Sequence, residues 1–135
     1  MTYDRMQEKG VTQLLYAYSP GTEPKDSTEY LERYPGDDII DLIGVDAYQF
    51  DRDAYLKSLD NSLTIMSQVS KAHNKLMAVT ETGYETIPDS LWWTQTLIPA
   101  IEKYPISYVL VWRNAREREL SLIHISEPTR LGMIS

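Results

Sequence analysis

The feature that most constrains the fold is an alternation of short apolar segments with longer amphipathic ones. Each apolar segment has the length and the polar, glycine or proline boundaries of a buried strand. The longest amphipathic segment places Leu59, Leu63 and Met66 at helical spacing. We expect strands at residues 11–18, 38–49, 75–83 and 106–115, and helices at residues 2–10, 27–37, 53–74 and 89–105.

Apolar strands separated by helices indicate a parallel sheet covered on both faces. Successive strands begin about 30 residues apart, the usual length of a strand–helix–strand unit. The glycine-rich phosphate loop usual in nucleotide-binding sheets follows none of them, which disfavours a nucleotide-binding α/β domain. We therefore predict an α/β fold of the (β/α)8 TIM barrel type. Because a complete barrel needs about 250 residues, we expect a partial barrel, about strands 5–8 with their helices.

Composition excludes several classes of function. The chain of 135 residues carries 20 acidic and 13 basic residues, a net charge of −7, which argues against nucleic-acid binding. It contains no cysteine, so disulfides, thiolate catalysis and cysteine metal sites are excluded. No apolar run approaches the roughly 18 residues of a membrane span. The 10 tyrosines and 3 tryptophans favour a sugar ligand, because sugars bind flat aromatic faces with polar edges.

The last part of the chain breaks the pattern. Residues 116–119 alternate arginine and glutamate, as a GA-dinucleotide repeat would encode. Residues 120–130, LSLIHISEPTR, resemble the in-frame translation of a common transposase sequencing adapter. We therefore expect one domain at residues 1–115 and an artefactual tail at residues 116–135, and we assign the tail no functional residue.

The third expected strand ends in a carboxylate, Glu81. A buried ionised carboxylate is costly unless it is paired or used in chemistry. The C-terminal strand ends of a barrel form its active site, where Asp46 and Tyr48 would come from the preceding strand and Trp112 from the following one. A carboxylate with a tyrosine hydroxyl and an indole nearby is typical of a glycosidase nucleophile. The alternative is that Glu81 pairs with an arginine or caps a backbone turn.

Several stretches, in this order and at these spacings, resemble glycoside hydrolase family 26, best known for β-mannanases. They are LLYAYSP (14–20), YPGDDIIDLIGVDAYQ (34–49), VTETGYE (79–85) and LWWTQTLIPAIEKYPISYVLVWRNA (91–115). The resemblance covers residues 1 to about 115. It implies that these residues are the C-terminal half of a (β/α)8 catalytic domain that hydrolyses β-glycosidic bonds with retention, without a metal or other cofactor.

Carried over position by position, the resemblance implies roles for individual residues. Glu81 matches the nucleophile, and Tyr48 matches the tyrosine that orients it. Asp41 matches an aspartate that supports the strand end beside the nucleophile. The substrate-binding positions are Asp46, which shares that supporting role, Tyr84, Trp112 and Arg113.

The resemblance also implies that a catalytic partner is absent. Retention requires a nucleophile and an acid/base carboxyl group about 5–5.5 Å apart. The family takes the acid/base from a His-Glu pair at the end of strand four, and no His-Glu pair occurs here. We therefore expect a fragment of a retaining endo-β-1,4-mannanase that is inactive and poorly folded alone.

The partner that this interpretation implies is a polysaccharide, β-mannan or a related glycan. The parent protein is expected to be exported, because polymeric glycans do not enter cells. Two alternatives remain open at this stage. One is another family 26 specificity, for xylan or mixed-linkage β-glucan, and the other is a catalytically inactive carbohydrate-binding barrel or scaffold.

Overall fold

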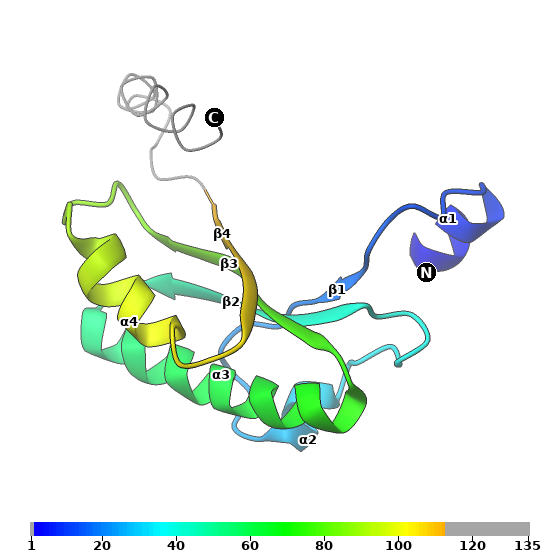
Figure 1. Cartoon of the computed structure of the whole chain (residues 1–135), viewed down its shortest axis with the longest axis horizontal. Coiled ribbons are helices and arrows are strands. Elements are labelled where there is room, and N and C mark those ends of the chain that lie inside the picture. The colour runs from blue at the N-terminus through cyan, green and yellow to red at the C-terminus, as the bar shows by residue number, and fades with distance from the viewer. Residues whose placement is uncertain (1, 113–135) are drawn as a thin grey trace.

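The computed structural model describes residues 2–112, which form a four-stranded parallel sheet in the order β1-β2-β3-β4. Strands that follow one another in the chain are neighbours in the sheet (Figure 1), as the barrel interpretation predicts. The strands are β1 (Ala17–Tyr18), β2 (Leu42–Gln49), β3 (Leu76–Tyr84) and β4 (Ile106–Val111).

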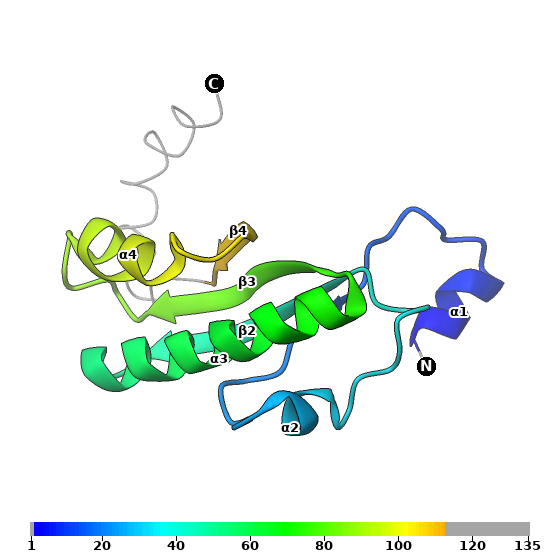
Figure 2. The same ribbon diagram turned by 60° about the horizontal axis from the view of Figure 1, so that its bottom comes forward.

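One long helix, α3 (Arg52–His73), runs along one face of this sheet (Figure 2). It begins where the Asp51 carboxylate accepts a hydrogen bond from the Ala54 backbone N at 2.8 Å, and it ends at Asn74, whose φ of 53° is left-handed. The other helical segments are α1 (Thr2–Glu8), α2 (Ser27–Leu31), η1 (Trp93–Leu97) and α4 (Ile98–Ile101). The long helix expected at residues 53–74 is therefore present.

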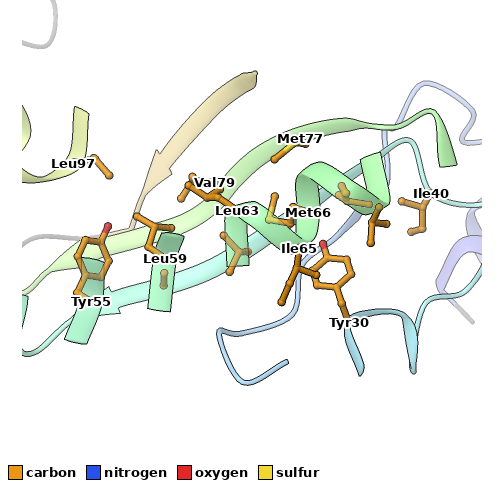
Figure 3. Packing of buried hydrophobic residues seen from close by; sticks show 14 of the residues in the cluster. Tyr30, Ile40, Tyr55, Leu59, Leu63, Ile65, Met66, Met77, Val79 and Leu97 are labelled. Carbon is orange, nitrogen blue, oxygen red and sulfur yellow. The ribbon is translucent and has the colours of Figure 1, made fainter. Parts of the chain in front are cut away.

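The hydrophobic core lies between α3 and the sheet. Leu59, Leu63 and Met66 of α3 are fully buried, and they belong to the same cluster as Met77 and Val79 of β3 (Figure 3). The opposite face of the sheet is more open in the described part of the chain. The expectation that each strand is covered on both faces is therefore met only on the helix side of residues 2–112.

The first expected strand is much shorter than predicted. Only Ala17 and Tyr18 of residues 11–18 pair with β2, while Leu15 is 78% exposed. The segment before Ala17 precedes the start of β2 in register, so β2 offers it no ladder partner. The apolar pattern therefore overestimated the length of this strand because pairing, not propensity, sets the ends of a strand.

The helix expected at residues 89–105 is divided into the π-helical turn η1 and the short helix α4. Pro99 lies in the first turn of α4 and has no N–H for the carbonyl of Gln95. That carbonyl instead accepts a hydrogen bond from the Arg52 guanidinium at 2.9 Å. The caps also differ from the prediction, because Asp26, and not Ser27, caps α2 by accepting from the Glu29 backbone N.

Candidate active site

The C-terminal halves of β2 and β3 bring three of the predicted site residues together. Asp46 and Glu81 are register partners on the two strands. The hydroxyl of Tyr48, two residues further along β2, donates a hydrogen bond to Glu81 Oε1. Partial burial, followed by the hydrogen bond to Glu81 and its negative charge, raises the pKa of Tyr48 above its usual value. Tyr48 is therefore a protonated donor at neutral pH.

Glu81 reaches this position through a β-bulge in β3. Between the register pairs Gly44↔Ala78 and Asp46↔Glu81, β3 contains one residue more than β2. Val79 packs in the core, and Thr82 on the same face contacts the buried Tyr55 hydroxyl of α3 at 2.7 Å. The two residues between them, Thr80 and Glu81, both lie on the opposite face. A regular strand would alternate and would turn one of them towards the helices.

A cluster of polar side chains lies beside Glu81 on the open face. Asp46 Oδ1 accepts a hydrogen bond from Ser19 Oγ at 2.6 Å and one from Thr80 Oγ1 at 3.3 Å. The Thr80 and Ser19 hydroxyls also contact each other. Residues that follow β1 or belong to β2 and β3 therefore share one network, and Asp46 has neighbours that compensate its partial burial.

A hollow of about 200 Å³ opens at the same strand ends, and its wall is rich in aromatic rings. Trp112 follows β4 and is 60% exposed, with its backbone N held by the Thr82 carbonyl at 3.0 Å. Phe50 is 91% exposed at the end of β2. The lining residues are Tyr48, Gln49, Phe50, Gly83, Tyr84, Glu85 and Trp112. Such a rim of exposed rings can stack on sugar faces.

One wall of the hollow is supported from behind by a buried indole. The Trp92 ring donates a hydrogen bond from Nε1 to Gln49 Oε1 at 2.8 Å and lies 6.3 Å, between ring centroids, from Tyr84. Trp92 is buried, whereas its neighbour Trp93 is partly exposed. Tyr84 is thus half-buried against Trp92 while it lines the hollow.

The two predicted aspartates lie at opposite ends of β2. Asp41 precedes β2, and its Oδ2 accepts a hydrogen bond from the Tyr16 backbone N at 2.8 Å. It therefore supports the start of the β1–β2 pair and not the end that carries Tyr48. Asp46 is the aspartate that supports the active end. Arg113, predicted to bind substrate, lies outside the described residues.

Sequence reasoning did not identify the residues that make room for the site. A Cβ on Gly44 would lie 2.3 Å from both Thr80 Oγ1 and Thr80 Cγ2, and a Cβ on Gly83 would lie 3.0 Å from Tyr48 Cε1. Glycine is therefore required opposite Thr80 and favoured beside Tyr48. The available signal was an isolated glycine within each apolar strand, which often marks a bulge or a close approach.

Within residues 2–112, no three histidine, aspartate or glutamate side chains are grouped closely enough to hold a metal ion. None of the helices in this part of the chain is both long and apolar enough to cross a membrane. The geometry contains instead a carboxylate oriented by a phenol at the edge of an aromatic-lined hollow.

Comparisons with known proteins agree on one family. The sequence model of glycosyl hydrolase family 26 matches residues 1–127, a range that extends beyond residue 115 into the segment expected to be an artefactual tail. A mannan endo-1,4-β-mannosidase of Bacillus subtilis is 31% identical over 107 residues, which are 78% of this chain and 26% of that protein. A mannan endo-1,4-β-mannosidase of Bifidobacterium adolescentis is 38% identical over 81 residues, which are 56% of this chain and 8% of that protein.

Solved structures agree with the sequence matches. A family 26 β-mannanase from Bacteroides ovatus is 63% identical with a TM-score of 0.83, over 87% of this chain and 34% of that chain. A Cellulomonas fimi endo-β-1,4-mannanase is 31% identical with a TM-score of 0.72, over 85% of this chain and 28% of that chain.

The chain thus spans about a quarter or less of the curated relatives and about a third of these structures. The parallel sheet and these likenesses confirm the predicted fold class, a partial (β/α)8 barrel. The chain belongs to glycosyl hydrolase family 26.

Proposed function

We propose that this chain contributes the nucleophile half of the active site of a retaining endo-β-1,4-mannanase. The observation that carries the proposal is the hydrogen bond from the Tyr48 hydroxyl to Glu81 at the aromatic-lined strand ends of a family 26 chain. The names of the relatives, which are mannan endo-1,4-β-mannosidases, support mannan as the substrate.

In the proposed reaction Glu81 attacks the anomeric carbon of the sugar. Tyr48 binds Oε1 and fixes the rotation of the carboxylate, so that Oε2 forms the new bond to carbon. The bond to the leaving oxygen breaks, and an acid residue supplied by another part of the whole protein protonates that oxygen. Water, deprotonated by the same residue, then hydrolyses the glycosyl ester and returns the free carboxylate of Glu81 with net retention.

The aromatic residues of the rim have a second role in the proposal. Trp112 presents an exposed ring at the end of β4, next to β3, where it can stack beneath the sugar that is cleaved. Tyr84 forms part of the same wall. We assign Asp46 to supporting the strand end, with its substrate contact remaining a prediction. Because its substrate is polymeric, we also propose that the whole protein acts outside the cytoplasm.

The test is an assay of the whole protein that contains this chain against three glycans: β-1,4-mannan, xylan and mixed-linkage β-glucan. We expect oligosaccharides from mannan, with the β-anomer formed first in the proton NMR spectrum. A mannoside with a fluorine at C2 and an activated leaving group should label the peptide that contains Glu81, as seen by mass spectrometry.

The outcomes separate the alternatives. Faster cleavage of xylan or mixed-linkage β-glucan would replace the substrate and keep the mechanism. Formation of the α-anomer first, or labelling of a different carboxylate, would overturn the role of Glu81. Binding of mannan without hydrolysis by the whole protein would replace the enzyme proposal with that of a carbohydrate-binding barrel.

A further inference from the structure

We propose that Thr80 is a positioning residue whose hydroxyl holds the β3 bulge that turns Glu81 into the active site. This inference rests on the proposed function for its activity readout, but its structural part does not. The residue has no assigned role in the reaction, and it acts through Glu81 and not on the substrate.

The first step is the direction of the side chains along β3. Val79 and Thr82 both face the helix side, through the core cluster and the Tyr55 hydroxyl respectively. These two residues are three apart, so a strand of regular alternation would place them on opposite faces. The bulge absorbs the extra residue. If it were lost while Val79 remained in the core, Glu81 would turn towards α3 and away from Tyr48.

The second step is what stabilises the bulge. A bulge leaves a ladder group without its regular partner, and Thr80 Oγ1 donates a hydrogen bond to the Val45 carbonyl of β2 at 3.1 Å. Val45 lies between the two register pairs that bracket the bulge, so this bond forms where the ladder is interrupted. The Thr80 hydroxyl thus supplies a hydrogen bond that the strand backbone does not make.

The third step is the position of the Thr80 side chain among its neighbours. Its hydroxyl contacts Ser19 Oγ, and it lies 3.3 Å from Asp46 Oδ1, on the residue that is the register partner of Glu81. Gly44 provides the space, because a Cβ there would lie 2.3 Å from Thr80 Oγ1. The hydroxyl is therefore confined on more than one side and cannot rotate freely without breaking these contacts.

The experiment compares Thr80→Val, which keeps the shape and removes the hydroxyl, with Thr80→Ser, which keeps the hydroxyl. Thr64→Val is the matched control, since Thr64 contacts Tyr104 on the exposed side of α3, away from the site. All variants are made in the whole protein. For Thr80→Val we expect kcat to fall roughly 100-fold with KM changed less than about 3-fold, because misplacing a reacting group reduces the chemical step more than binding.

We expect Thr80→Ser and Thr64→Val to keep kcat within about 3-fold of the wild type, a rescue that a purely steric role for Thr80 would not produce. Equal kcat for Thr80→Val and wild type would overturn the proposal. So would equal losses in Thr80→Val and Thr80→Ser, because the hydroxyl would then not be the important group.

A crystal structure of the Thr80→Val variant gives a readout that does not require activity. We expect the Glu81 carboxylate to leave the Tyr48 hydroxyl, whereas an unchanged bulge and an unchanged Tyr48–Glu81 hydrogen bond would overturn the inference. If the wild type hydrolyses no glycan, the proposed function fails and this structural comparison still decides the role of Thr80.

If Thr80→Val does not fold, Ser19→Ala replaces it, because this change removes one neighbour of the hydroxyl and leaves the bond to Val45. A drop in kcat of roughly 3- to 10-fold with unchanged KM supports the inference in that case. An unchanged kcat overturns it, or, in an inactive wild type, an unchanged Glu81 position in the crystal.

Discussion

The two faces of β2 and β3 are built from the same strands but differ in chemistry. On the helix side, Val45 and Val79 are fully buried beneath α3. On the other side, Asp46, Tyr48 and Glu81 are hydrogen-bonded polar groups with partial exposure. Residues that alternate along one strand therefore serve stability on one face and the proposed chemistry on the other.

This division means that stability and activity can be changed separately. The helix side loses free energy when apolar volume is removed, since neighbouring side chains collapse only partly into the space. The open side loses function when a hydrogen bond is removed, with little effect on the buried area. Substitutions on the two faces should therefore give opposite patterns.

The largest effect is expected for Glu81→Gln on the open face. The amide cannot form the glycosyl ester, so mannan hydrolysis by the whole protein should fall by about 10⁴-fold or more. The melting temperature should stay close to that of the wild type. Retention of more than about a tenth of the activity would show that Glu81 is not the nucleophile.

Leu63→Ala tests the helix face. Leu63 is fully buried between α3 and the sheet, so its truncation should lower the free energy of unfolding by about 2–5 kcal/mol. Urea unfolding of the whole protein measures this change, with kcat of the folded fraction close to the wild-type value. A loss of kcat with no loss of stability would contradict the proposed separation of the two faces.

Gly83→Ala sharpens the comparison on the open face. The new Cβ would lie 3.0 Å from Tyr48 Cε1, so the ring must move and its hydroxyl should lose register with Glu81. We expect kcat to fall roughly 10- to 100-fold. In a Tyr48→Phe background the same change should have little further effect. Equal losses in the two backgrounds would show that Gly83 does not act through the Tyr48 hydroxyl.

The smallest effect is expected at an exposed contact away from both faces. Hydrogen bonds to the Asp37 carboxylate from the Tyr34 hydroxyl and from the His73 ring, which is 2.9 Å away, lower the pKa of Asp37. A lowered pKa in the folded state stabilises the protein above the usual carboxyl pKa, and the stabilisation disappears as pH falls through the lowered value.

Asp37→Asn should therefore reduce the melting temperature slightly at pH 7 and leave it unchanged near about pH 2. The expected shift is smaller than that of Leu63→Ala, because Asp37 is solvent-exposed and its interactions are screened. A larger destabilisation in acid than at neutral pH would contradict this assignment.

The prediction of the fold succeeded where local pattern and tertiary structure agree. The apolar residues of α3 recur at helical spacing, and the polar residues Asp46, Tyr48 and Glu81 follow apolar runs, so their place at neighbouring strand ends followed from parallel topology. The catalytic roles of Glu81 and Tyr48 stay predictions. Residues 116–135 lie outside the described residues, and the expectation of an artefactual tail there stays a prediction as well.

The predictions were wrong where a distant partner decides the local structure. The length of β1 depends on where β2 begins, and the helix around Pro99 is interrupted where Arg52 binds the carbonyl of Gln95. Asp41 was assigned to the wrong end of β2 because a sequence does not show which backbone group a carboxylate will reach.

The sequence by itself determined the order of the elements, the parallel sheet and the identity of the polar residues at the strand ends, because these depend on hydrophobic periodicity within each segment. Only the tertiary structure decided which face those residues occupy. The alternation of a strand would separate Thr80 from Glu81, and the bulge that unites them depends on contacts with Val45, Asp46 and Ser19 from other parts of the sheet. Side-chain direction at this site is thus a property of strand pairing, which local sequence does not encode.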